Sequence, residues 1–449
     1  MLSPKPDGHI DHAPGGPLGE AALALYGAAG RVGAPIAGAV LRWRERGGKE
    51  DAARRGERLG SASRARPAGP LVWVHAASVG ESNAALPLIE HLAERGPTLL
   101  LTTGTVTAAE IAKRRLPSGA IHQFVPIDTP GAVDRFLDHW RPNLAIFAES
   151  ELWPTMLEAV RRRSLPLVVV NARMSERSFR SWRTFTPLAR AVLGRASLYL
   201  AQTTADAERL RALGARNVIV SGNLKFDVPP PPADSATLAI LRQQIAGRPT
   251  LVAASTHPGE EAAVIIAHRE VIRDGSRLLT VLAPRHPDRG DAIAAQIAGA
   301  GLTVGRRSRH EPIADSVDVY LADSIGEMGL WYRLADVAFL GGSMVARGGQ
   351  NPIEPAKLMV PIVHGSHIRN FRDIYDALDA AKAAVKVNDA SALAATVKRL
   401  IEDRSERERL ARDARSCIEQ FSGALGRTLD ALEPYFAPLC HADEAASRA

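Results

Sequence analysis

The chain has 449 residues, more than one ordinary hydrophobic core accommodates, so its length predicts two domains. Apolar residues make up 46% and charged residues 23% of the chain, a balance that excludes an intrinsically disordered protein. A formal net charge of +7 favours anionic partners such as nucleotides, phosphorylated lipids or a membrane surface, without choosing among them. Aromatic residues are scarce at 5% and no basic run alternates with them, so we expect no nucleic-acid partner.

The N-terminal region does not have the pattern of a secretory signal. We expect residues 1–20 to form a polar, disordered extension and residues 21–66 to associate with a membrane. Within the second segment, a weakly apolar stretch from Ala21 to Leu41 is interrupted by Arg31 and Pro35. A basic cluster follows it, made of Arg42, Arg44, Arg46, Lys49, Arg54, Arg55 and Arg58. This order suits an anchor beside anionic headgroups, and a surface helix packed on the first domain is the alternative.

Residues 67–228 alternate short apolar runs with longer amphipathic stretches, which is typical of a parallel sheet covered by helices on both faces. The predicted strands are Leu71–Val74, Thr98–Thr103, Leu144–Phe147, Leu165–Val170 and Leu198–Ala201. The alternation stops at Pro229–Pro232, and prolines in succession favour a stiff connector, so we place a linker at residues 229–235.

The same alternation resumes in residues 236–436, which predicts a second doubly wound α/β domain. Its predicted strands are Thr250–Ala254, Leu278–Ala283, Val317–Leu321, Val337–Leu340 and Pro361–His364, with helices from Ala390 to Phe436. Residues 437–449 are left as a tail. Two Rossmann-like domains facing across a cleft would bind ligands at the carboxyl ends of their strands. Cys417 and Cys440 have the spacing of neither a zinc knuckle nor a redox pair, so we predict no metal site.

Three motifs of the first domain bear groups for acid–base chemistry. Glu81 follows the first strand at the start of a helix, where it is either a first-turn cap or a general base. Glu149 and Glu151 follow an apolar strand and, by alternation, would share one side and repel each other unless a cation intervenes. Lys225, just before the linker, would supply that cation, or be an ordinary surface lysine.

Three motifs of the second domain suit a nucleotide. The strand-end arginine of Pro284-Arg285 has the geometry to grip a phosphate, and Ile325-Gly326-Glu327 precedes a helix whose N–H groups would cradle one. The paired glycines Gly341-Gly342 would let a ligand approach the backbone, and Glu354 of Asn351-Pro352-Ile353-Glu354 would accept hydrogen bonds from ribose. None is a recognised nucleotide fingerprint, and each alone is weak.

Taken in order, these motifs resemble the Kdo (3-deoxy-D-manno-oct-2-ulosonic acid) transferases of lipopolysaccharide biosynthesis, from about Ala21 to Tyr435. The matching words are His75 to Glu81, Glu149 to Pro154, Asn171 to Ser175, Leu224 to Asp227, Ser255 to His257, Pro284 to Pro287 and Gly348 to Glu354. The resemblance implies a GT-B fold with an N-terminal membrane-anchoring helix, although this segment is unusually rich in Ala and Gly for that role.

The resemblance also implies metal-independent, inverting transfer of Kdo from CMP-Kdo to the lipid A precursor lipid IVA, without a cofactor, at the cytoplasmic face of the inner membrane. Glu81 matches the family's general base, and Glu149 and Lys225 match residues assigned to transition-state stabilisation. The segments that match the CMP contacts are Pro284-Arg285, Ile325-Gly326-Glu327 and Asn351-Pro352-Ile353-Glu354.

Three other functions fit the residues less well. Another GT-B transferase would use a UDP-sugar on a different lipid or glycan, and an epimerase would act on a nucleotide sugar without an acceptor. A basic, non-catalytic membrane or nucleic-acid binding protein would bind with steep salt dependence. The number of Kdo residues transferred, the acyl-chain preference and the oligomeric state leave no sequence signal.

Overall fold

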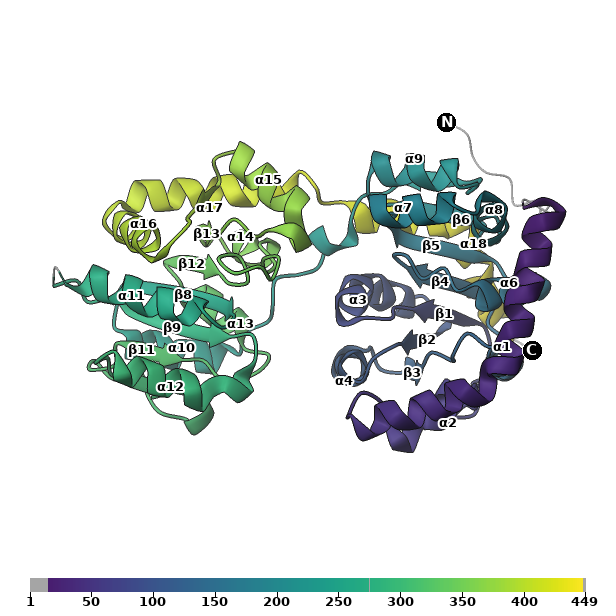
Figure 1. The fold of residues 1–449 in the computed structure, drawn as a ribbon, viewed down its shortest axis with the longest axis horizontal. Coiled ribbons are helices and arrows are strands. Elements are labelled where there is room, and N and C mark those ends of the chain that lie inside the picture. The colour runs from purple at the N-terminus through teal and green to yellow at the C-terminus, as the bar shows by residue number, and fades with distance from the viewer. Residues whose placement is uncertain (1–14, 274, 447–449) are drawn as a thin grey trace. The chain divides into compact units, whose positions relative to one another are not determined.

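A computed structural model describes residues 15–273 and 275–446 (Figure 1). The chain divides into two compact units. Unit 1 comprises the chain up to Val228 together with the segment from Ser422 onward, and unit 2 is Pro229–Phe421. The chain therefore passes from unit 1 to unit 2 where the proline run begins, between Val228 and Pro229.

Unit 1 is built on a seven-stranded, all-parallel sheet in the order β3-β2-β1-β4-β5-β6-β7. Its strands are β1 (Leu71–His75), β2 (Thr98–Thr103), β3 (Ile121–Phe124), β4 (Leu144–Ala148), β5 (Leu167–Ala172), β6 (Leu198–Ala201) and β7 (Val218–Val220). The strand order reverses between β1 and β4. In open α/β sheets, ligands bind outside the carboxyl ends of the strands at this switch point.

Helices cover both faces of this sheet because successive strand residues point to opposite sides. Trp73 and Phe147 face one apolar cluster, whereas Val72, Val74 and Ile146 face the other. The helices between the strands are α3 (Val79–Ala93), α4 (Val106–Arg115), α5 (Pro130–Trp140), α6 (Pro154–Arg162), α7 (Glu176–Arg183), α8 (Thr186–Leu193) and α9 (Thr204–Ala212). A 3₁₀ turn, η2 (Leu224–Phe226), follows β7.

Unit 2 contains a second seven-stranded parallel sheet, in the order β10-β11-β9-β8-β12-β13-β14. Its strands are β8 (Thr250–Thr256), β9 (Leu279–Pro284), β10 (Val304–Arg306), β11 (Val319–Leu321), β12 (Val337–Leu340), β13 (Ile362–His364) and β14 (Ala384–Lys386). The helices are α10 (Ser235–Ile245), α11 (Glu260–Ile272), α12 (Gly290–Gly299), α13 (Met328–Leu334), α14 (Ile353–Lys357), α15 (Arg372–Ala380), α16 (Ala390–Glu402) and α17 (Arg404–Glu419). Here the switch point lies between β8 and β12.

The predicted strands are all present, within a few residues at their ends, and the four that the sequence did not predict form the outer edges of the two sheets. β3, β7, β10 and β14 have three or four residues each. Edge strands are short and carry polar residues, as in Ile121-His122-Gln123-Phe124, so they lack the apolar run that identifies a central strand.

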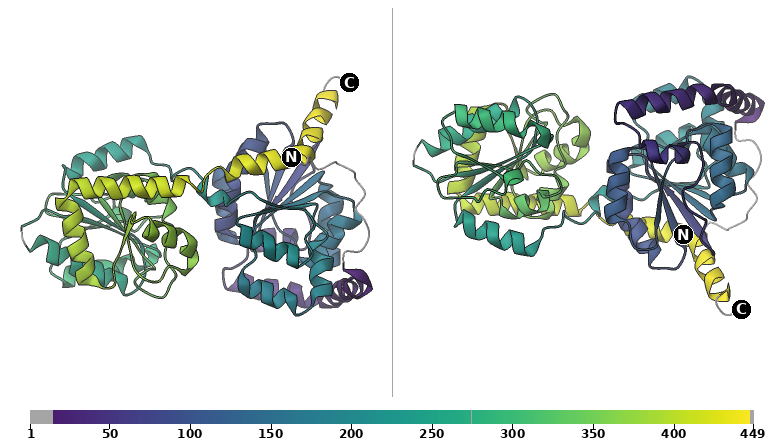
Figure 2. Two further views of the ribbon diagram at one scale, coloured as in Figure 1. Left: turned by 90° about the horizontal axis from the view of Figure 1, so that it is seen from above. Right: turned by 90° about the horizontal axis from the view of Figure 1, so that it is seen from below.

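The C-terminal helix corrects the predicted limits of the second domain, which placed residues up to 436 there. Helix α18 (Ala424–Ala446) belongs to unit 1 and lies on α3 and η2 (Figure 2). Leu432 and Phe436 are buried in the apolar cluster of that unit. The Asp227 carboxylate accepts hydrogen bonds from the backbone N–H groups of Gly423 and Leu425, at 2.7 and 2.6 Å. The sequence pattern shows that this helix has an apolar face, but it does not show which of the two domains that face covers.

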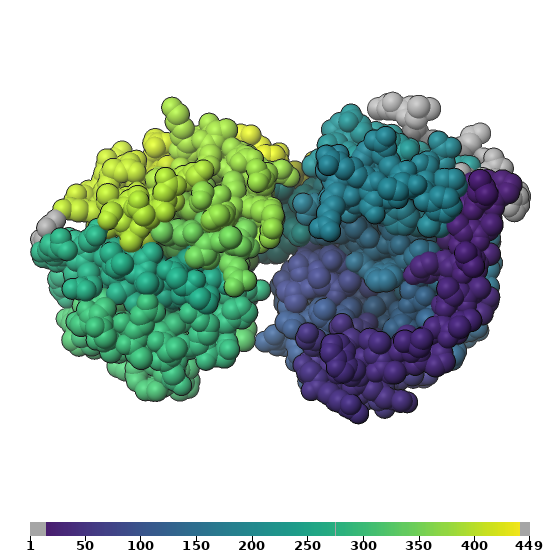
Figure 3. Space-filling view, in the orientation of Figure 1, coloured from purple at the N-terminus to yellow at the C-terminus, as the bar shows by residue number. Residues whose placement is uncertain are grey.

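Helix α1 (Gly16–Arg46) begins earlier than the segment predicted at residues 21–66, and residues 1–14 lie outside the described residues. It runs along α8, α6 and α5 of unit 1, as the purple ridge in Figure 3 shows. At Gly19, a β-carbon would come within 2.4 Å of the Pro187 carbonyl oxygen, so only glycine permits this approach. A packing requirement therefore explains the glycine at position 19, whereas β-carbons at Gly27, Gly33 and Gly38 would meet no neighbour within 4 Å.

The outer face of α1 is apolar. Its exposed side chains follow one another at helical spacing and are Leu18, Leu25, Val32, Ile36 and Trp43, each at least 69% exposed. Of the described helices, α1 alone is long and apolar enough to cross a membrane by length and composition. An exposed apolar stripe of this kind marks a surface for a membrane or a partner.

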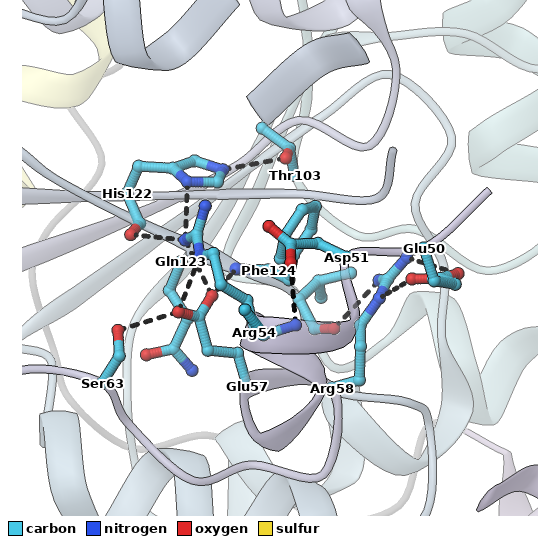
Figure 4. A network of polar contacts seen from close by, with 12 residues as sticks. Glu50, Asp51, Arg54, Glu57, Arg58, Ser63, Thr103, His122, Gln123 and Phe124 are labelled. Carbon is cyan, nitrogen blue, oxygen red and sulfur yellow. Dashed lines mark hydrogen bonds and ion pairs between the residues drawn. The ribbon is translucent and has the colours of Figure 1, made fainter. Parts of the chain in front are cut away.

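Part of the predicted basic cluster is structural (Figure 4). Arg58 is buried, pairs with Glu50 at 3.0 Å and donates to the Val125 carbonyl at 3.1 Å. Arg54 pairs with Glu57 at 2.8 Å and contacts His122, whose pKa burial and the Arg54 charge lower to about 3. Arg44 and Arg55 pair with Glu50 and Glu45. Arg42, Arg46 and Lys49 make no ion pair with the described residues, so these three cations stay available to anionic headgroups.

Candidate active site

The predicted residues of unit 1 follow strands whose carboxyl ends meet at one edge of the sheet. Glu81 follows β1 and Glu149 follows β4, so the two flank the switch point. Lys225 lies in η2 after β7. We call this the catalytic edge, because it gathers ionisable side chains where sheets of this type bind ligands.

Glu81 occupies the third position of helix α3, whose N-cap is Ser78. Its carboxylate accepts hydrogen bonds from the Ser78 hydroxyl and from the Ala77 backbone N–H, both at 2.8 Å. Burial raises the pKa of Glu81, the two hydrogen bonds oppose the shift, and the charges of Glu151 and Glu149 add to it. The cap geometry thus holds the carboxylate still, while burial and neighbouring charge raise its affinity for a proton.

Glu149 and Lys225 form an ion pair, with Lys225 Nζ 2.6 Å from Glu149 Oε1. Both side chains are largely buried, at 16% and 29% exposure. The two residues are 76 positions apart in the sequence. The sequence analysis expected Lys225 as the cation that would offset the repulsion between Glu149 and Glu151, and the structure places it against Glu149. Glu149 has a left-handed backbone, with φ at 57°, which breaks the alternation expected along the strand.

Glu151 diverges from Glu149 and contacts different partners. Its Oε2 lies 3.4 Å from Nε2 of the fully buried His75 and accepts a hydrogen bond from the indole N–H of Trp153. Burial raises the pKa of Glu151, but the hydrogen bonds and the His75 charge outweigh burial and leave it below its usual value. The catalytic edge thus holds one carboxylate with a raised pKa, Glu81, beside two anionic neighbours.

Asn171 is a site residue that the sequence interpretation included only as part of a motif. It is the last residue but one of β5, is 1% exposed and contacts both Glu149 and η2. In the sheet order, β5 lies between β4, which Glu149 follows, and β7, which leads to Lys225. A polar residue near the carboxyl end of this strand is the feature that could have identified Asn171.

The predicted nucleotide-binding residues of unit 2 also meet at one sheet edge, the donor edge, after β9, β11 and β12. Arg285 follows β9, is exposed and makes no ion pair with the described residues. Its positive charge opposes the rise in the pKa of Glu354 that burial causes, and it adds to the lowering of the pKa of His257 by burial. Pro284, just before it, is the buried last residue of β9. His257 follows β8, and the site prediction did not include it.

The Ile325-Gly326-Glu327 loop precedes α13 and is fixed at one end. Arg307 pairs with Glu327 at 2.6 Å and lowers the pKa of that carboxylate. Gly326 has a φ of 90°, a conformation that side-chain-bearing residues rarely adopt. Ile325 is 78% exposed, so the loop presents an aliphatic side chain at the donor edge.

The Asn351-Pro352-Ile353-Glu354 segment opens α14. The Asn351 side chain accepts the Ile353 N–H at 3.0 Å and donates to Glu354 at 3.2 Å. Burial raises the pKa of Glu354, a shift that the Asn351 hydrogen bond and the Arg285 charge oppose.

The backbone N–H groups at and after the glycine pair that follows β12 bind a side chain of the protein itself. The backbone N–H groups of Gly342, Ser343 and Met344 donate to the carboxylate of Glu260, at 2.6, 3.0 and 3.0 Å. Glu260 is fully buried, so the protein's own anion fills this nest of N–H groups. Among the described residues, no group of three or more His, Cys, Asp or Glu side chains is arranged to hold a metal ion.

Residues 53–228 match the family model described as 3-deoxy-D-manno-octulosonic-acid transferase (kdotransferase). The 3-deoxy-D-manno-octulosonic acid transferase of Bordetella pertussis is 39% identical over 394 residues, covering 84% of this chain and 91% of that protein. A probable mitochondrial 3-deoxy-D-manno-octulosonic acid transferase of Arabidopsis thaliana is 36% identical over 375 residues, covering 81% and 84%.

The fold also has solved counterparts. A glycosyltransferase from Rickettsia africae ESF-5 aligns with a TM-score of 0.55 at 10% identity, covering 82% of this chain and 99% of that one. At this identity the likeness concerns the fold alone, and it agrees with the predicted arrangement of two Rossmann-like domains of GT-B type.

Proposed function

The chain belongs to the 3-deoxy-D-manno-octulosonic acid (Kdo) transferase family, and we propose that it transfers Kdo from CMP-Kdo to the lipid A precursor lipid IVA with inversion. It is thus a glycosyltransferase of lipopolysaccharide biosynthesis. The observation that carries the proposed mechanism is the catalytic edge of unit 1, where a capped carboxylate lies beside an ion pair.

We propose that Glu81 is the general base. The Ser78 hydroxyl and the Ala77 N–H hold its carboxylate in place, and its raised pKa gives it the affinity to take a proton from an acceptor hydroxyl. The deprotonated oxygen attacks the anomeric carbon of Kdo while the bond to the CMP phosphate breaks. One base and one displacement invert the configuration without a covalent intermediate.

The leaving phosphate needs positive charge and hydrogen-bond donors. We propose that Arg285 binds it, since this cation is exposed and not engaged in an ion pair with the described residues. Lys225, held by Glu149 at 2.6 Å, is proposed to stabilise charge that develops in the transition state. With a monophosphate as the leaving group, such cations suffice, so we expect transfer without a divalent metal or another cofactor.

The remaining donor-edge residues are proposed to fix the nucleoside. Glu354 lies in the first turn of α14, at the same sheet edge as Arg285, and we assign it to the ribose hydroxyls. The side chain of Glu327 is engaged by Arg307, so the contribution of the Ile325-Gly326-Glu327 loop is proposed to come from its backbone.

We propose that α1 lies on the cytoplasmic face of the inner membrane rather than crossing it. Its glycine face packs on unit 1, whereas Leu25, Val32 and Ile36 project outward. The carboxylate of Glu20 in α1 pairs at 2.6 Å with Arg195, which is buried in unit 1. Leaving unit 1 to span a bilayer would break these contacts.

The test is to incubate the purified protein with CMP-Kdo generated in situ and tetraacylated lipid A precursor, with no divalent metal during transfer. We expect a mass spectrum to show the acceptor heavier by one or more Kdo units. An unchanged acceptor with intact CMP-Kdo would contradict the proposal, and comparing CMP with UDP binding would then test the alternative of a UDP-sugar donor.

A further inference from the structure

The Glu149–Lys225 pair joins two strands that are not neighbours. In the sheet order, β5 and β6 separate β4, which carries Glu149, from β7, which leads to Lys225. No ladder hydrogen bonds connect β4 to β7, so another group must set the distance between the carboxylate and the ammonium. The ion pair alone does not fix it, because a lysine side chain has several rotatable bonds.

Asn171, near the end of β5, contacts Glu149 and the backbone of Leu224, the residue before Lys225. Its Oδ1 accepts the backbone N–H of Leu224 at 3.0 Å, which anchors η2 one residue before Lys225. Its Nδ2 lies 3.5 Å from Glu149 Oε1, the same oxygen that Lys225 contacts. One buried amide therefore spans the gap between the two halves of the pair.

A second chain of contacts reinforces this arrangement. The Asn171 carbonyl accepts a hydrogen bond from the Gln202 side chain at 3.0 Å, and Gln202 accepts one from Asn223 at 3.2 Å. The Asn223 side chain in turn accepts the backbone N–H of Lys225 at 3.0 Å. Asn171 thus reaches the lysine by two routes, through Leu224 and through Asn223.

The backbone at Asn171 suits asparagine. Its φ is 53°, in the left-handed region, and the register of β5 with β6 shifts between Val169 and Ala172. Asparagine tolerates this conformation better than most residues and offers a donor and an acceptor on one short side chain. Aspartate would keep the acceptor but place a negative charge beside Glu149.

We infer that Asn171 is a positioning residue that holds Lys225 and Glu149 at the spacing required for transfer. This inference rests on the proposed function, because it assigns Asn171 an effect only through Lys225. A purely structural role makes a different prediction. If only the left-handed backbone mattered, glycine at this position would be fully active, since glycine adopts that conformation freely.

The test is a double-mutant cycle with Asn171→Gly and Lys225→Ala, measured as kcat and KM of Kdo transfer with long incubations that detect residual product. Asn171→Gly should lower kcat by on the order of tenfold to a hundredfold, because small displacements of a charged group are costly, while KM for CMP-Kdo changes little. In the Lys225→Ala background the same change should cost less than twofold, since its target is already absent.

Asn143→Gly is the matched control. The Asn143 side chain accepts the Leu71 N–H at 2.9 Å. This bond is of the same kind but lies at the amino ends of β1 and β4, away from the catalytic edge. Its loss should therefore lower the melting temperature without lowering kcat. Asn171→Asp is the second variant, which keeps the acceptor for Leu224 but adds a buried negative charge beside Glu149; we expect a reduced kcat together with a lower melting temperature.

Three results would overturn the inference: wild-type kcat in Asn171→Gly, an equal loss with and without Lys225, or wild-type kcat in Asn171→Asp. Failure of the proposed function is distinguishable, because the wild-type protein would then give no Kdo transfer in the same assay.

Discussion

The catalytic edge of unit 1 and the donor edge of unit 2 end similar sheets but are built from different groups. At the catalytic edge, side chains face one another, and burial and two anionic neighbours raise the pKa of Glu81. At the donor edge, the protein's own ion pairs and hydrogen bonds organise the loops, as Glu260 does for three backbone N–H groups. In the proposed function, the first edge exchanges a proton and the second holds the donor.

This contrast explains why similar sheet frameworks serve different roles. A group that must change its protonation state needs a pKa that its surroundings have shifted. A binding loop needs rigidity, which buried carboxylates supply without taking part in chemistry. Substitutions at the first edge should therefore change turnover, and substitutions at the second should change affinity or stability.

The largest effect is expected for Glu81→Gln. The amide keeps the shape of the side chain but does not accept the proton, so kcat should fall by on the order of a hundredfold or more. CMP affinity, measured by calorimetry, should be unchanged because the donor edge is intact. Near-normal turnover would leave Glu81 with its capping role alone.

A smaller effect, on affinity, is expected for Arg285→Ala. The loss of a charged hydrogen bond to phosphate should weaken CMP binding by roughly tenfold or more, equivalent to about 1.5–3 kcal/mol, without changing the melting temperature.

Arg289→Ala provides the comparison within the same loop. Arg289 pairs at 2.7 Å with Glu261, which is 1% exposed. Its removal leaves a buried carboxylate without that cation, so the melting temperature should fall while CMP affinity is retained. Equal CMP affinity in Arg285→Ala and the wild type would remove Arg285 from the donor site.

The pH dependence of transfer should respond to Glu151. Glu81 must be deprotonated to act as a base, so kcat/KM falls as the pH drops through its pKa, which lies above the usual value for glutamate. Glu151→Gln removes a negative charge that raises this pKa. The acid limb of the profile should therefore move to lower pH.

Glu158→Gln is the control for that profile. Glu158 lies in α6 and pairs with Arg161 and Arg195, and its charge is not among those that shift the pKa of Glu81. The acid limb of the Glu158→Gln pH profile should therefore match that of the wild type. An unmoved limb in Glu151→Gln would remove the Glu151 charge from the causes of the raised pKa of Glu81.

The sequence predicted the central strands and the Glu149–Lys225 ion pair, and it placed Glu81 at the start of a helix, because these features follow from local patterns. Apolar runs identify buried strands, and residues that follow them gather at one sheet edge. It did not predict that α18 returns to unit 1, since that depends on contacts such as Asp227 with Gly423, nearly 200 positions apart. Nor did it predict that Glu260 occupies the nest after β12, because a buried carboxylate at a helix start has no distinctive sequence signal.

The N-terminal segment shows the same limit. Composition indicated a weak anchor, but only the packing of Gly19 against Pro187 separates a glycine-rich inner face from an apolar outer one. Likewise, the run of arginines did not distinguish Arg58, which is buried and paired, from Arg42, which is not paired with any described residue.

The smallest effect on turnover is expected when Arg42, Arg46 and Lys49 are all changed to Glu. The same change should clearly weaken attachment to membranes. These cations lie beside the apolar stripe and face no acidic partner among the described residues, so their reversal should release the protein from vesicles that contain anionic lipid. Turnover on detergent-dispersed acceptor should stay near the wild-type value. Vesicle sedimentation measures the first property and the mass-spectrometric assay the second.

The matched control changes Arg404, Arg412 and Arg415 of α17 to Glu, which alters the net charge equally at exposed positions of unit 2. This variant should stay bound to the vesicles. Release of both variants would mean that overall charge governs attachment. Retention of both would assign it to the stripe of Leu25, Val32 and Ile36, because burial of apolar side chains in the interface does not depend on charge.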